Sequence, residues 1–357
     1  FSNTTASNNV AVGYNSLYIN TTGASNTAVG SGALDANTTA DNNAAFGKDS
    51  LTSNTTGTQN AAFGASTLTT ATTANYNTAL GAFSLVSTTG SNNTGVGRLT
   101  LYVNTSGAQN VAVGANALDS NTTASNNTAV GYASLEANTT GIGNVGVGMY
   151  SLDANTTANY NTAIGYQALT TNTSGTGNVA VGYDALGDST TAGNNTAVGY
   201  EALMTAQTAI QVTAVGFQAL KDCTASYNTA VGFQALDDCT SGTMNVAVGD
   251  GVLSAVTTQS SNTGMGHFAL NQSTGNNNSA FGRNCLRANT TGSQNTAFGA
   301  TAGTALTTGN YNTATGSEAL ETATTGNHNN AFGYQALHVT TTGHSNTSIG
   351  SHSMTAN

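Results

Sequence analysis

The segment Asn127–Leu152 reads NTAVGYASLEANTTGIGNVGVGMYSL and contains one phrase twice, first as NTAVGYASL and then as NVGVGMYSL. Variants of this phrase occur 21 times along the 357 residues. Its central glycine recurs from Gly13 to Gly350 at a spacing of 17, with three spacings of 16. A fixed short period over a whole chain predicts a repeat architecture. We therefore expect one continuous repeat domain over residues 1–357, as part of a longer fibre.

The repeat unit favours strands over helices. Glycine, asparagine and threonine are poor helix formers, and no apolar stripe with the period of a helix is present. A unit of 17 residues is shorter than helical-pair or propeller repeats need, and it suits one coil with one or two short strands and a turn. We predict an all-β fold, a parallel β-solenoid of about 21 coils.

The repeat can be numbered so that the recurring glycine is position 5. Position 1 is Asn in 20 of 21 copies, position 3 is always small, and position 9 is Leu in 19 copies. Positions 2 and 4 of a strand point to one side and positions 3 and 5 to the other. We expect position 4 and the position 9 leucine to fill the interior, while Ala and Gly at positions 3 and 5 leave a smooth outer face that another backbone can approach. We expect Asn at position 1 to lie at a turn and to form a ladder of stacked amides.

The composition argues against several functions. Five Lys and Arg residues stand against fifteen Asp and Glu, for a net charge of -10. Phosphate binding needs cationic side chains, so we expect no nucleic-acid partner. No apolar run approaches the roughly 20 residues of a membrane-spanning helix, so we expect no membrane insertion. Neither a nucleophile elbow nor a phosphate-binding loop is present, and we expect no enzymatic activity and no cofactor.

The copies NTAIGYQAL at Asn161–Leu169 and NTAVGYEAL at Asn195–Leu203 resemble known repeat arrays. They are similar to the head repeats of trimeric autotransporter adhesins and to arrays in phage tail-fibre proteins, and the resemblance covers essentially the whole chain. It implies a left-handed β-roll with three chains side by side and the small-residue strand near the threefold axis. The period of 17 is longer than is usual in adhesin heads. No stalk, anchor or chaperone domain is recognisable in these residues, which leaves virion and cell surface both open.

Aromatic side chains at position 6 form a candidate contact stripe in five consecutive copies. The stripe consists of Tyr166, Tyr183, Tyr200, Phe217 and Phe233. Such a stripe can stack on sugar rings or on a neighbouring fibre, and it can instead be a ladder that covers the side of the solenoid itself.

Asn-Thr-Thr corners create repeated glycosylation sequons. The candidate acceptors are Asn20, Asn37, Asn54, Asn104, Asn121, Asn138, Asn155, Asn172 and Asn289. In a secreted protein such sequons are surface acceptors, although here the repeat itself generates them. The same Thr pairs suggest an ice-binding solenoid as a minority interpretation.

Two cysteines fall one coil apart. Cys223 and Cys239 both occupy position 12, and stacking would bring their Cα atoms to about 4.8 Å, within the range of a disulfide. The alternative is a pair of buried thiols, since cysteine packs as a small apolar residue. Cys285 lies at position 8 and is interpreted as structural.

Other polar groups are interpreted as solvated surface. Acidic residues favour positions 6, 7, 10 and 11, and the densest group is Asp222, Asp237 and Asp238. The calcium-binding roll motif is missing. Four histidines lie late in the chain, namely His328, His338, His344 and His352. They fall at different coil positions, so we expect no metal site.

These observations predict a non-enzymatic structural fibre, an adhesin shaft or head, outside the cell or on a virion. Its partners would be itself, as a homotrimer, and a surface glycan or receptor. The alternative is a self-assembling extracellular filament subunit that carries glycans, and the minority alternative is the ice-binding solenoid.

Overall fold

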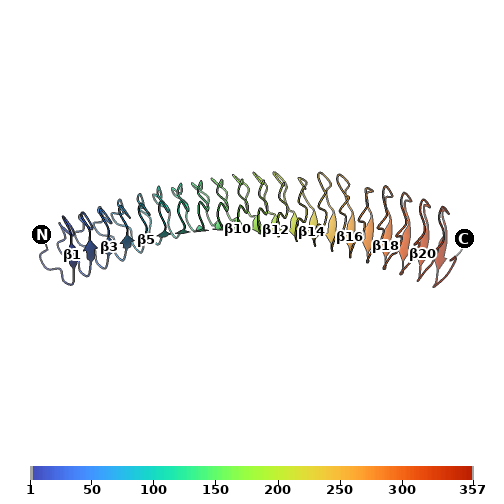
Figure 1. Cartoon of the computed structure of the whole chain (residues 1–357), viewed down its shortest axis with the longest axis horizontal. Coiled ribbons are helices and arrows are strands. Elements are labelled where there is room, and N and C mark those ends of the chain that lie inside the picture. The colour runs from blue at the N-terminus through green and yellow to red at the C-terminus, as the bar shows by residue number, and fades with distance from the viewer. Residues whose placement is uncertain (1–2, 356–357) are drawn as a thin grey trace. The chain divides into compact units, whose positions relative to one another are not determined.

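A computed structural model describes residues 3–355. These residues form 21 short parallel strands, one per coil, in a β-solenoid with a repeat of about 17 residues (Figure 1). The predicted all-β solenoid is thereby confirmed. The chain divides into two compact units, Phe1–Asn178 and Val179–Asn357, and each is described by itself. The single domain over residues 1–357, the left hand and the trimer stay predictions.

Each strand consists of three residues, at positions 2 to 4 of its coil. The strands of the first unit are β1 (Val10–Val12), β2 (Thr27–Val29), β3 (Ala44–Phe46), β4 (Ala61–Phe63), β5 (Thr78–Leu80), β6 (Thr94–Val96), β7 (Val111–Val113), β8 (Thr128–Val130), β9 (Val145–Val147) and β10 (Thr162–Ile164). Those of the second unit are β11 (Val179–Val181), β12 (Thr196–Val198), β13 (Thr213–Val215), β14 (Thr229–Val231), β15 (Val246–Val248), β16 (Thr263–Met265), β17 (Ser279–Phe281), β18 (Thr296–Phe298), β19 (Thr313–Thr315), β20 (Asn330–Phe332) and β21 (Thr347–Ile349).

Within each unit, consecutive strands pair in parallel and in register. Ala112 of β7 pairs with Ala129 of β8, and the flanking residues pair in the same order. In the second unit, Ala197 of β12 pairs with Ala214 of β13. The strand positions of a coil therefore lie beside their equivalents in the next coil, which is what allows equivalent side chains to stack.

The strand faces are the reverse of the prediction. Alanines at position 3, such as Ala129 and Ala163, are fully buried, whereas the position 4 side chains face outward. The position 9 leucines, such as Leu135, are buried as predicted. The space beside these leucines is narrow: the alanines fill it without any exposed surface, and at Gly95 even a Cβ would lie 2.5 Å from Ser84 Oγ. Alanine is therefore selected at position 3 by the space inside the coil.

Position 5 requires glycine for two reasons. Gly131 has a φ of 137°, which side-chain-bearing residues rarely adopt, and a Cβ there would lie 2.5 Å from the carbonyl oxygen of Gly148. The close backbone approach inferred from the sequence exists, but the approaching backbone is the next coil. The smooth face expected for a neighbouring chain is therefore wrong at both position 3 and position 5.

Two ladders of buried asparagines tie the coils together. At position 1, the backbone N–H of Asn127 donates to Oδ1 of Asn110 over 3.0 Å, and Nδ2 of Asn127 donates to the carbonyl of Gly141 over 2.9 Å. The amide ladder predicted at position 1 is confirmed. The left-handed backbone lies one residue earlier, at position 17, where Asn126 has a φ of 64°. Position 1 therefore selects asparagine for its amide rather than for its backbone freedom.

Candidate functional surfaces

The strand face, meaning the side chains at positions 2 and 4, is open to solvent within each unit. In the first unit Val12 is 57% exposed and Leu80 is 50% exposed, and in the second unit Phe298 is 51% exposed. Phe46 and Phe63 stack with ring centroids 4.7 Å apart, so these side chains contact their equivalents one coil further on. Each unit thus carries a row of exposed or half-exposed apolar side chains at position 4, interrupted in the second unit by Thr315.

Charge is excluded from the strand face and concentrated elsewhere. No copy of the repeat has a charged residue at position 2 or position 4. All charged side chains except Asp41 instead occupy positions 6, 7, 10 and 11. The solenoid therefore has one uncharged side, and the residues after each strand and after each leucine carry its net negative charge.

The aromatic stripe is a ladder of stacked rings. In the second unit, Tyr183, Tyr200, Phe217 and Phe233 stack with centroids 4.9, 5.4 and 5.2 Å apart and interplanar angles of 9, 11 and 9°. Tyr166 belongs to the first unit, where it meets Tyr150 edge-on at 6.5 Å. Stacked rings cover one another's faces and leave their edges exposed. This geometry favours the self-covering ladder over sugar stacking, which uses ring faces.

The sequon asparagines form the second buried ladder. All nine candidate acceptors, Asn20, Asn37, Asn54, Asn104, Asn121, Asn138, Asn155, Asn172 and Asn289, are at most 2% exposed. Each Nδ2 donates to the carbonyl three residues further on. Since Nδ2 is the atom that carries an N-linked sugar, their predicted role as surface acceptors is corrected. The sequon recurs along the chain because each of these coils uses the buried asparagine amide for a hydrogen bond.

The two cysteines at position 12 stack as expected. Cys223 Sγ and Cys239 Sγ lie 3.3 Å apart, and both side chains are buried and unbridged. The neighbouring thiol holds the pKa of Cys223 below its usual range and raises that of Cys239. Burial raises the pKa of Cys285 to about 12, which fits the structural role predicted for it. The pair is placed for disulfide formation, which stays a prediction.

The densest acidic group contains one perturbed carboxyl. Burial, followed by the charge of Asp238, raises the pKa of Asp237 to about 6, and Asp222 adds to the effect. Oδ1 of Asp237 is buried and has no hydrogen-bond partner. This carboxyl therefore favours its neutral form in the folded chain more than a solvated surface residue would.

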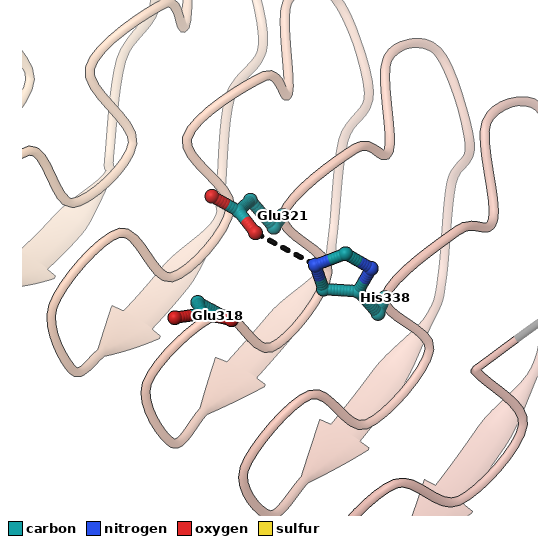
Figure 2. A group of neighbouring side chains, drawn as sticks. All are labelled: Glu318, Glu321 and His338. Atoms are coloured by element: carbon teal, nitrogen blue, oxygen red, sulfur yellow. Dashed lines mark hydrogen bonds and ion pairs between the residues drawn. The ribbon is translucent and has the colours of Figure 1, made fainter.

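Glu318, Glu321 and His338 form a cluster that the sequence analysis missed. The two glutamates occupy positions 7 and 10 of the β19 coil, and His338 occupies position 10 of the β20 coil. One potential ligand atom from each residue lies within 4.8 Å of the others. Figure 2 shows the three side chains on neighbouring coils. The prediction of no metal site rested on the different coil positions of the histidines alone. The signal in the sequence is that Glu321 and His338 share position 10 in consecutive coils, with Glu318 at position 7 of the first.

Between residues 3 and 355 there is no helical segment of the length and apolarity that crossing a bilayer requires.

Comparison with known proteins adds no functional assignment. No protein-family model matches the chain, and no curated protein matches its sequence.

Proposed function

We propose that this chain is a non-enzymatic structural fibre segment, a shaft or head outside the cell or on a virion, that self-associates through its strand face as a homotrimer. One observation carries the proposal: the side chains of positions 2 and 4 face outward along each unit without a charged residue among them, and those of position 4 are apolar in every copy except Thr315. The resemblance to trimeric adhesin heads and tail fibres supports the number of chains. The charged positions 6, 7, 10 and 11 would then present the attachment surface to a receptor or glycan.

The size of the strand face supports a second copy of this chain as its occupant. Val12 and Leu80 are half exposed and the other position 4 side chains of the first unit less so, so its ten strands expose on the order of 400–700 Å² at position 4. Patches above a few hundred Å² usually mark interaction sites, and a standard interface buries about 800 Å² on each partner. The area is sufficient for a stable association.

The chemistry of the strand face also fits a copy of itself. Chains that carry a net charge of -10 repel one another, and only a face without charges lets them approach without a like-charge penalty. Because every coil repeats the same pattern, two copies can align their rows over many coils. Each coil then contributes a small amount to the free energy of association, and these contributions add up along the length.

Lysines on the strand face test the proposal. The double variant Phe63→Lys and Leu80→Lys places two charges on neighbouring strands, and it should yield single chains of 35.4 kDa in sedimentation. The matched control is Ser31→Lys with Ala65→Lys, which adds the same charge at the exposed position 6, where Lys48 already stands. The control should assemble like the parent chain. Unchanged assembly of the strand-face variant would reject the interface.

Ice binding is a second candidate, favoured by the regular Thr-Thr corners. Threonines at position 14, such as Thr39 and Thr123, are exposed. Those at position 13 are committed to the fold, because Thr122 Oγ1 donates to the carbonyl of Thr139 over 3.0 Å. Thermal hysteresis that falls in a Thr39→Lys, Thr123→Lys variant would support ice binding, and its absence from the parent chain would remove this candidate.

A further inference from the structure

We propose that Glu318, Glu321 and His338 bind a divalent transition-metal ion of the zinc class and so join two consecutive coils. The proposal is independent of the proposed self-association, since its site lies on positions 7 and 10 rather than on the strand face. It replaces the earlier expectation that the chain offers no metal site.

The coil register places the three side chains together. The backbone N–H of Leu320 donates to the carbonyl of Ala336 over 3.1 Å, and that of Thr322 donates to the carbonyl of His338 over 3.1 Å. Thr322 Oγ1 donates to the same His338 carbonyl over 2.6 Å. The backbone beneath the cluster is therefore fixed from both coils, and the side chains need only small rotations to converge.

The side-chain contacts already orient the potential ligands. Nε2 of His338 lies 2.7 Å from Oε2 of Glu321, the contact drawn as a dashed line in Figure 2. Gln335 Nε2 donates to Oε2 of Glu318 over 2.6 Å. The hydrogen bond from Gln335 leaves the second oxygen of Glu318 for an ion. The side chains of His338 and Glu321 are 25% and 32% exposed, so an ion could enter from solvent and keep a water ligand.

The local charge favours a cation. Two carboxylates share this group, and no Lys or Arg follows Arg287 in the sequence. No Lys or Arg after Arg287 can therefore offset the negative charge of the two carboxylates. A bound metal ion would offset it, with His338 as a neutral ligand. An ion held by all three residues would satisfy both carboxylates at once.

The ligand types select the class of metal. Zinc takes histidine nitrogen and carboxylate oxygen at about 2.0–2.2 Å and is commonly held by three protein ligands and one water. Calcium and magnesium prefer oxygen ligands alone and more of them. Imidazole suits zinc and its first-row neighbours, so Zn²⁺ should bind far more tightly than Mg²⁺.

Titration calorimetry of the full chain with ZnCl₂ tests the proposal. We expect one ion per chain with micromolar affinity, proton release on binding, and no heat with MgCl₂. His338→Gln keeps a hydrogen-bond donor for Glu321 but lacks the imidazole, and it should weaken binding at least about 100-fold. Glu318→Gln, which changes no shape, should weaken it about 10-fold or more and serves if the histidine variant does not fold.

The chain offers a matched control. His267 Nε2 lies 3.6 Å from Asp250 Oδ2 one coil away, a histidine–carboxylate pair without a second carboxylate in the group. His267→Gln should bind Zn²⁺ like the parent chain. Equal affinity of the parent, His338→Gln and Glu318→Gln chains would overturn the proposal, because other histidines would then hold the zinc. The absence of zinc binding to the parent chain would also overturn it.

Discussion

The leucine at position 9 combines backbone strain with burial in almost every coil. Leu135 and Leu220 have φ values of 53° and 51°, in the left-handed region, and both side chains are fully buried. The left-handed conformation is unfavourable by roughly 1–2 kcal/mol for such a residue, whereas burying a leucine contributes about 1.5–3 kcal/mol. Burial is therefore the larger effect. At Gly303, one of the two positions 9 without leucine, the buried Leu306 at position 12 supplies the missing apolar volume.

The asparagine ladder at position 12 ends where the next coil lacks an amide. Asn54 Oδ1 is buried without a hydrogen-bond partner, and the residue one coil on is Ala71. Ala71→Asn should donate to this oxygen and raise the free energy of unfolding by about 1 kcal/mol. Urea denaturation measures the change. Ala71→Leu adds similar volume without a donor and should not stabilise; equal effects of the two variants would contradict the ladder argument.

Asp237 predicts a local dependence of stability on pH. Its folded pKa of about 6 lies above the ordinary value of 3.8, so the folded state holds its proton more tightly than the unfolded state. This contribution to stability is largest below about pH 4, falls as pH rises to about 6, and stays lost above that. Asp237→Asn should therefore stabilise the chain near neutral pH and flatten this part of the profile. Identical melting of the variant and the parent near neutral pH would contradict the account.

At the scale of the coil, the orientation of the strand is the feature to test. Ala129→Leu should destabilise the chain by about 1–3 kcal/mol through overpacking, because position 3 faces a narrow interior. Val130→Leu, the matched enlargement at the half-exposed position 4, should change stability by less than about 0.5 kcal/mol. Thermal unfolding of the two variants measures the difference. The reverse order would restore the orientation inferred from the sequence.

The stacked cysteines give a second prediction for the coil. On refolding with oxidised glutathione, the Cys223 thiolate would attack the glutathione disulfide and release one glutathione, and Cys239 would then displace the second. The product should lack two hydrogens by mass and be more stable by about 3 kcal/mol, as expected for a closed loop of this size. Cys285→Ser should form the same bond. A free-thiol count of three after this treatment would exclude it.

The repeat period was sufficient to predict the solenoid, the position 9 core and the amide ladder at position 1. The period could not show which strand face turns inward, because alanine and valine are both apolar and the choice depends on the width of the coil. Asn20 and Asn138 were predicted to lie on the surface because a sequon indicates a surface acceptor. Their burial could not be predicted from the sequence, since it depends on the hydrogen bonds to the carbonyls of Gly23 and Gly141. The contact between Glu321 and His338 could be found only from the register between coils.

At the scale of the whole molecule, the two sides of each unit have different roles in the proposed fibre. The strand face is uncharged, with mostly apolar side chains at position 4 and mostly threonine at position 2, which suits burial against other copies of the chain. Positions 6, 7, 10 and 11 carry nearly all of the charge and vary from coil to coil, which suits recognition of another molecule. Assembly and attachment would then use separate positions of the same repeat.

A native mass spectrum of the purified chain tests self-association most directly. The account predicts a species of three chains, each of 35.4 kDa, with no added mass from sugar on the buried asparagines. An open-ended series of multiples of the chain mass would indicate a filament in place of the trimer, held by the strand face or by stacking of the solenoid ends. A spectrum that contains only single chains at micromolar concentration would contradict the central claim that the exposed strand face is an interface between copies.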